Sequence, residues 1–99
     1  MESFYVGTDL KFKITLTATG FSQADDDYTI HLTCGKEKRV IHKSDILEDD
    51  GDYYLVIDTS TFPSGVLRMT VFAEVEDESF DDVIRTETAS IDLCQLKYT

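Results

Sequence analysis

The stretch Glu48–Asp58, EDDGDYYLVID, opens with a cluster of carboxylates of the kind that binds calcium. An EF-hand loop needs glycine at its sixth position and acidic residues at positions one, three, five and twelve. With Gly51 as the sixth residue, positions one and twelve are Ile46 and Ile57, so the EF-hand pattern fails. Glycine adopts a positive φ in a turn at little cost. The sequence therefore predicts a turn into a strand and no metal site, and a looser calcium site shared with other acidic loops stays an alternative.

Nucleophilic and zinc chemistry would have to come from the four residues His31, His42, Cys34 and Cys94. A catalytic triad needs a nucleophile, a base and an orienting group in contact, whereas both histidines occupy outward or edge positions of predicted strands. The two cysteines and two histidines lack the spacing of zinc motifs, and the chain has no glycine-rich phosphate loop. We therefore predict that the protein is not an enzyme and has no catalytic residue and no cofactor.

Strands must position these residues, because apolar and polar residues alternate with a period of two along most of the chain. The predicted strands cover residues 10–17, 28–34, 39–42, 53–58, 66–75, and 83–96 as one strand or two. Only residues 44–50 suit a single helical turn. Short strands about ten residues apart, joined by polar turns, predict an all-β fold. We expect one domain over residues 1–99, an antiparallel immunoglobulin-like β-sandwich of about seven strands, with a small barrel as the alternative.

One face of each predicted strand is apolar and should form the core. The residues expected to be buried are Phe12, Ile14, Leu16, Ile30, Leu32, Leu55, Ile57, Leu67, Met69, Val71, Ile91 and Leu93. The same alternation places Cys94 opposite the face of Ile91 and Leu93, which argues against a bridge to Cys34. The chain also has no Trp, and Asp92 stands where an antibody-type domain has Tyr. Two free thiols in a reducing compartment are therefore expected.

The charge of the chain limits its partners. Nine basic and twenty acidic residues give a net charge of −11, which nucleic acid and anionic membranes repel. No apolar run is long enough to span a membrane, and the N-terminus with Glu2 does not resemble a secretory signal, so a cytoplasmic protein is expected. Four basic residues gather in one short segment: Lys36, Lys38, Arg39 and Lys43. They predict either an edge strand whose lysines block unwanted pairing or a docking patch for an acidic neighbour.

The run from residue 44 to residue 93 resembles the β-sandwich domains of tailed-bacteriophage structural proteins, especially the N-terminal domain of baseplate upper proteins. The resemblance rests on a turn and strand start at Asp49–Tyr53, a break at Phe62–Gly65, a long strand at Val66–Val75 and a final strand at Thr86–Leu93. The segment GTDLKFKITL is similar to the opening strand of that family. Baseplate upper proteins continue into fibre-linked regions that this sequence lacks. The resemblance therefore implies a virion subunit such as a capsid decoration, neck, tail or fibre-adaptor protein, without catalytic residues.

The N-terminal segment MESFYV places Phe4, Tyr5 and Val6 ahead of Gly7. Such an apolar arm either packs on a neighbouring chain or folds back as the first strand of its own domain. Together with the four basic residues, these three are the predicted interface. The expected partners are other virion proteins or copies of the chain itself in a homo-oligomer, with assembly into the virion in the host cytoplasm.

Two other functions remain open. A carbohydrate- or protein-binding module would use exposed aromatic residues, for which the candidates are Phe4, Tyr5, Phe21, Tyr54, Phe72, Phe80 and Tyr98. An acidic mimic of nucleic acid would use the net charge, although the acidic residues cluster in turns and form no regular stripe.

Overall fold

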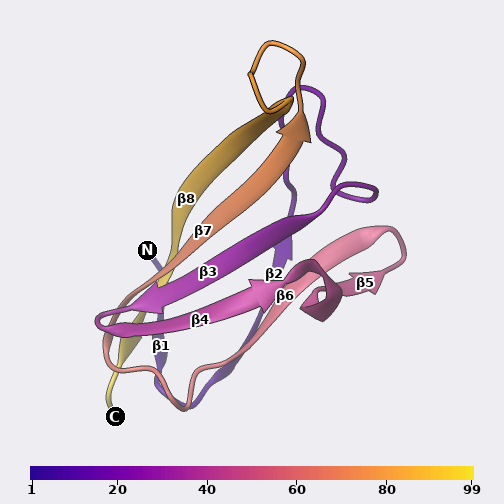
Figure 1. Cartoon of the computed structure of the whole chain (residues 1–99). Coiled ribbons are helices and arrows are strands. Elements are labelled where there is room, and N and C mark those ends of the chain that lie inside the picture. The colour runs from indigo at the N-terminus through magenta and orange to yellow at the C-terminus, as the bar shows by residue number, and fades with distance from the viewer.

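The computed structural model describes all residues, 1–99. Strands make up 59% of the chain and there is no α-helix, which confirms the predicted all-β class. In chain order the elements are β1 (Ser3–Tyr5), β2 (Asp9–Ile14), β3 (Tyr28–Cys34), β4 (Glu37–His42), the 3-10 turn η1 (Lys43–Asp45), β5 (Leu47–Asp49), β6 (Asp52–Asp58), β7 (Gly65–Glu76) and β8 (Ile84–Lys97) (Figure 1). The three-residue strands β1 and β5 bring the number of strands to eight.

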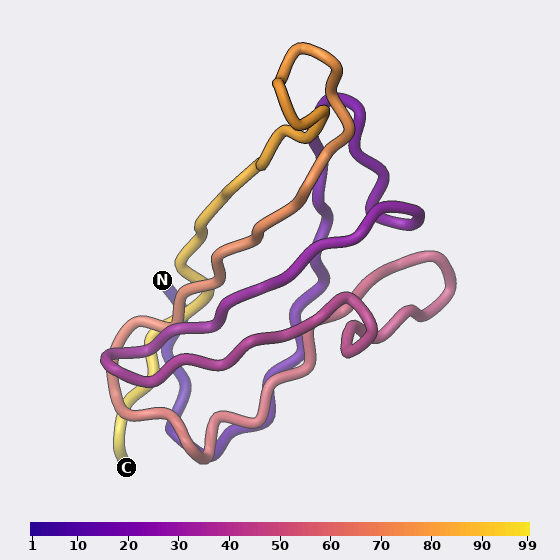
Figure 2. The backbone as a smooth tube through the Cα atoms, in the orientation of Figure 1, coloured from indigo at the N-terminus to yellow at the C-terminus, as the bar shows by residue number.

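The strands form two sheets. One has the order β1-β8-β7-β3-β4 and the other the order β2-β6-β5. Every neighbouring pair is antiparallel except β1 and β8, which run parallel, so the sheets are mostly antiparallel and the first sheet is mixed at its N-terminal strand. The molecule is elongated, with principal extents of 51 × 32 × 22 Å. The hairpin of β7 and β8 reaches a tip that lies at the opposite end of the molecule from the C-terminus (Figure 2).

Two tight turns have the chemistry that the strands require. The β5–β6 turn consists of Asp50 and Gly51, both with positive φ (52° and 82°), as in the type I′ turns that suit β-hairpins. The predicted turn in EDDGD is thus confirmed. The β3–β4 turn places Gly35, with φ of 59°, at its first central position, which is the glycine position of a type II′ turn.

The core lies between the two sheets and draws on both of them. Leu10, Ile14, Leu55 and Ile57 of the second sheet join Ile30, Leu32, Leu67 and other residues of the first sheet in one buried cluster. Eight of the predicted core residues are buried: Ile14, Ile30, Leu32, Leu55, Ile57, Leu67, Met69 and Val71. Three more, Phe12, Leu16 and Leu93, are partly buried against this cluster.

The core prediction is wrong for Ile91, whose side chain is 56% exposed. Ile91 shares the inward face with its buried partner Met69, but the second sheet ends at β2 and does not cover it. Further along the same strand the facing changes. The register of β7 and β8 shifts between the pairs Leu67↔Cys94 and Arg68↔Asp92, so that Leu93 is an extra residue in β8. Such a β-bulge reverses which residues of the strand face inward. Cys94 and Leu96 are therefore buried, at 0% and 1% exposure, although alternation from Ile91 placed Cys94 outside.

Candidate interaction surfaces

The N-terminal arm belongs to the domain itself. Phe4 lies opposite Leu96 in the parallel β1–β8 pair, and the backbone N–H of Val6 donates to the carbonyl of Lys97 at 2.8 Å. Phe4 and Val6 pack partly buried against the core, whereas Tyr5 is 55% exposed. The arm is thus the first strand of its own sheet, the second of the two alternatives that the sequence left open. Of its three predicted interface residues, Tyr5 alone presents most of its side chain to solvent.

Arg39 of β4 holds the loop that follows β6. Its guanidinium donates to the carbonyl of Asp58 at 3.0 Å and to Oγ1 of Thr61 at 2.6 Å, and it lies 4.6 Å from the ring centroid of Phe62. Arg39 is a planar donor with several N–H groups, and these three contacts use both its donors and its face. Its role in the folded chain is therefore to fix the β6–β7 connection.

Lys43 holds a second loop. Its Nζ donates to the carbonyls of Ala24 at 3.0 Å and Asp26 at 2.7 Å, in the connection between β2 and β3. Lys36 and Lys38 stay exposed at the other end of β4, beside the β3–β4 turn. Arg39 and Lys43 thus position loops, whereas Lys36 and Lys38 are exposed without such contacts; a docking role for the four residues stays a prediction.

The residues considered for metal or nucleophilic chemistry lie apart. No three His, Cys, Asp or Glu side chains come together in a group that could hold a metal ion. The ring centroids of His31 and Phe72 lie 4.6 Å apart with their planes tilted by 52°, and the backbone N–H of His42 donates to the Asp45 carboxylate at 3.0 Å at the start of η1. Both histidines thus have local structural contacts.

Both cysteines are free and buried in the first sheet. The Cys34 thiol donates to the carbonyl of Pro63 at 3.3 Å. Burial raises the pKa of the Cys34 thiol and of the Cys94 thiol, so both stay protonated and unreactive at neutral pH.

The aromatic residues considered for sugar stacking come from different elements. Phe4 and Phe21 pack against the core, and Tyr54 lies under the ammonium group of Lys11 at 4.4 Å. Phe80 belongs to the hairpin tip, whereas Tyr98 follows the end of β8. The structure therefore does not assemble them into one stacking platform.

An open strand edge is the most prominent surface feature, and it belongs to the last strand, which the sequence did not single out. On its inner side β8 pairs with β7 from Ile84 onward, but on its outer side β1 reaches only Gln95–Lys97. The outer edge of residues 84–94, called here the β8 edge, has no partner strand. β2 is likewise the terminal strand of the second sheet.

An apolar groove lies beside the β8 edge. It consists of two adjoining hollows of about 210 and 280 Å³ that share Leu16, Val71 and Ala89 in their walls. Phe21 and Ala73 complete the apolar wall of one hollow. Phe12, Ile14, Met69, Ile91 and Leu93 line the other. This β2–β8 groove exists because the second sheet ends at β2 and leaves the inward face of β8 uncovered.

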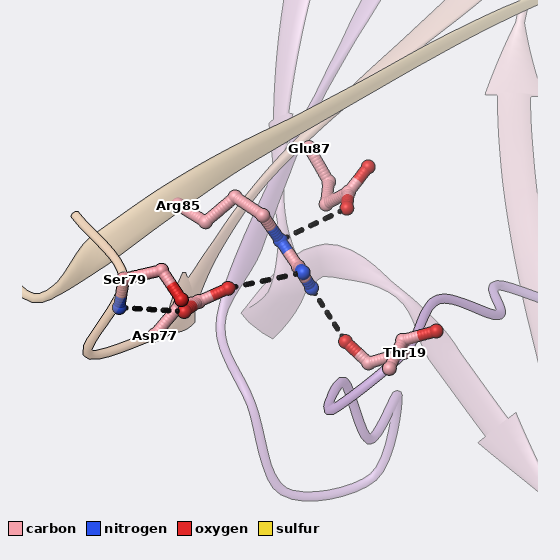
Figure 3. A network of polar contacts seen from close by, with 5 residues as sticks. All are labelled: Thr19, Asp77, Ser79, Arg85 and Glu87. Atoms are coloured by element: carbon pink, nitrogen blue, oxygen red, sulfur yellow. Dashed lines mark hydrogen bonds and ion pairs between the residues drawn. The ribbon is translucent and has the colours of Figure 1, made fainter.

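Arg85 fixes one wall of the groove (Figure 3). Its Nη1 donates to the Asp77 carboxylate at 3.2 Å, and its Nη2 donates to the carbonyl of Thr19, which lies in the segment that forms the groove wall. Its Nε lies 3.0 Å from Oε1 of Glu87, an ion pair without hydrogen-bond geometry, since Nε has no hydrogen-bond partner. Arg85 thus ties the hairpin tip to the segment after β2.

The hairpin tip carries much of the negative charge. Residues 74–87 contain seven acidic residues and one basic residue, Arg85, and therefore contribute −6 to the net charge of −11. The backbone N–H of Ser79 donates to Asp77 at 2.9 Å and is the main cause that lowers the pKa of this carboxyl, with a smaller contribution from Arg85. The end of the groove nearest the tip is thus strongly electronegative.

The Gln23 side chain bonds to the backbone of the segment after β2, where no neighbouring strand pairs with it. The Gln23 amide accepts a hydrogen bond from the N–H of Leu16 at 2.9 Å and donates to the carbonyl of Ile14 at 3.3 Å. The neighbouring Tyr28 hydroxyl is buried and makes no hydrogen bond of good geometry. Burial is the main effect on its pKa and raises it, while the nearby Gln23 side chain acts in the opposite direction. Gln23 therefore satisfies backbone groups where β2 has passed the end of β6.

Comparison with family models, with curated proteins and with solved structures gave no match to this chain. No helix of the structure is long and apolar enough to cross a membrane.

Proposed function

We propose that the protein is a non-enzymatic structural component of a bacteriophage virion that works through contacts with other virion proteins or with copies of itself. The observation that carries this proposal is the β8 edge. Open N–H and C=O groups along a strand are a ready site for another chain. Monomeric domains protect such edges with charges, proline or a covering segment, yet Thr88–Ile91 has no charged residue and no proline and nothing covers it.

The strand order supports an immunoglobulin-like sandwich as the scaffold. In immunoglobulin domains the sheets have the orders A-B-E-D and G-F-C, with further strands added beside C in variable domains. The orders β2-β6-β5 and β8-β7-β3-β4 correspond to B-E-D and G-F-C plus one added strand. The first strand, β1, lies beside the last strand instead of beside β2.

The role within a particle follows from these surfaces. A domain with an open edge at one end and exposed lysines on β4 at the other side of the sheet has two places for neighbours. We place it among capsid decoration, neck, tail or fibre-adaptor proteins, assembled in the host cytoplasm, because each of these roles needs contacts and no chemistry.

Density-gradient sedimentation tests the proposal. The tagged full chain is produced in its own host, and its position in the gradient is followed together with that of virion proteins. Co-sedimentation with the particles is expected. A chain that stays at the position of its 11.2 kDa monomer in every preparation would contradict the proposal.

A further inference from the structure

We propose that the β8 edge and the β2–β8 groove bind an extended segment of a partner protein in which apolar residues alternate with Lys or Arg. The segment adds to the first sheet as a further strand beside residues 84–94 of β8, on the hairpin-tip side of β1. This inference rests on the proposed assembly function and names the kind of partner and the way it binds.

The backbone of β8 provides the first half of the site. Residues in a strand alternately direct their N–H and C=O groups to the two sides, so the unpaired outer side of residues 84–94 offers a row of donors and acceptors. β1 already shows that this edge accepts a strand, since the N–H of Gln95 donates to the carbonyl of Glu2 at 2.9 Å. A partner strand continues the same pairing toward the hairpin tip.

The groove provides the second half of the site. Each hollow is smaller than the roughly 300–1,000 Å³ typical of pockets for small molecules. In strand addition, by contrast, small pockets take alternate side chains, which recur about every 6.6 Å on one face of a strand. Two adjoining apolar hollows along one strand therefore fit successive inward side chains of an added strand better than one compact ligand.

Charge selects the partner. The net charge of −6 in residues 74–87 lies at the end of the site nearest the hairpin tip, and Glu87 lines the groove. A second copy of this chain carries the same net charge of −11, so overall repulsion disfavours pairing of two copies, whereas a basic segment is attracted. Basic residues on the outward positions of the segment neutralise these carboxylates and speed association.

Ala89 allows a test that leaves the core intact. It is exposed and lines both hollows, so Ala89→Leu fills the groove without removing a buried group. Thr88→Leu is the matched control. Thr88 lies on the same open edge and at the rim of one hollow, but it pairs with the exposed Phe72, so its side chain points to the other face of the sheet. Both variants place a leucine at neighbouring positions of the same strand, so they differ mainly in the face on which the added side chain lies.

The experiment is a titration of the ¹⁵N-labelled full chain with the capped peptide Lys-Val-Lys-Ile-Lys-Val-Lys, read out by amide shifts and amide exchange. We expect saturable binding that protects alternate amides within residues 84–94, that weakens at least about tenfold in Ala89→Leu and with rising salt, and that persists in Thr88→Leu. The same peptide with alternate N-methylated residues loses binding, because it cannot complete the strand pairing.

Three results would overturn the inference: no saturable binding to the wild-type chain, equal binding by Ala89→Leu, or concentration-dependent dimers of the wild-type chain that Ala89→Leu abolishes. The last result would make a second copy the occupant. The gradient experiment separates this failure from failure of the proposed function. If the wild-type chain and Ala89→Leu enter particles equally, the assembly role stands and the β8 site is wrong; if the wild-type chain never enters particles, the assembly role is wrong.

Discussion

The β-bulge at Leu93 makes a quantitative prediction about two residues of one strand. Leu96 is 1% exposed and Ile91 is 56% exposed, although simple alternation from Ile91 would have placed Leu96 outside. Leu96→Ala removes a fully buried side chain and leaves a cavity, which costs about 2–5 kcal/mol of unfolding free energy. Ile91 buries less than half of its side chain, and full burial contributes roughly 1.5–3 kcal/mol, so Ile91→Ala should cost below about 1.3 kcal/mol.

Urea unfolding of the purified chain, followed by far-ultraviolet circular dichroism, measures both losses. With a slope of about 1–3 kcal/mol per molar urea, the midpoint should fall by at least ~0.7 M for Leu96→Ala and by clearly less for Ile91→Ala. Leu67→Ala is the reference for a fully buried leucine, because Leu67 is 0% exposed and lies in β7 opposite Cys94, next to the bulge. A loss below about 1 kcal/mol at Leu96 would refute the bulge, and a loss at Ile91 as large as that at Leu96 would refute the uncovered groove beside β8.

Three further predictions concern stability and pH. Thr59→Val should cost about 1–3 kcal/mol of unfolding free energy, because the buried Thr59 hydroxyl accepts from the N–H of Gly7 at 2.9 Å and donates to the carbonyl of Thr8 at 2.7 Å. Thr59→Ser should keep most of the stability in thermal or urea unfolding. Equal losses in the two variants would be inconsistent with this bonding. Tyr28→Phe should leave the melting temperature unchanged or raise it, because the hydroxyl is buried without a partner, and a drop of several degrees would mean that the hydroxyl has one. The native pKa of Asp77 is lowered, so the unfolded chain binds more protons near pH 4 and the stabilisation is lost as the pH falls through that region. Asp77→Asn should therefore flatten the acid side of the stability profile, and an unchanged profile would contradict this.

Local patterns in the sequence predicted most of the strands. Alternation identified β2, β3, β6 and β7 and their buried faces, because each of these strands has one face on the core and one toward solvent. The Asp50–Gly51 turn was also predictable, because two successive positive φ angles favour Asn, Asp and Gly. These features depend on residues close together in the chain.

The features that the sequence did not reveal depend on residues far apart. The bulge at Leu93 leaves no local signal, since either phase of LCQL contains apolar residues. The partner of β1 is at the other end of the chain, and residues 3–5 alone did not distinguish a free arm from an edge strand. Alternation also says nothing about whether a neighbouring sheet extends far enough to cover Ile91.

The interface residues show the same limit. A cluster of basic residues in the sequence suggested one patch, but Arg39 and Lys43 bond to carbonyls in two different loops. The β8 edge and the β2–β8 groove arise only when strand order is known, because they exist where both sheets end on the same side of the molecule. The signal that could have pointed to them is the uncharged run Thr88–Ile91 within a long, exposed final strand.

The central claim, that this domain presents an unpaired strand edge to its partners, is tested most directly by amide hydrogen exchange of the free monomeric chain. The structure predicts an alternation along residues 84–92, in which amides bonded to β7 exchange slowly and those on the outer side exchange rapidly, while β7 between its two neighbours is protected throughout. Uniformly slow exchange along residues 84–92 in the monomer would mean that the β8 edge is already covered and would contradict the account.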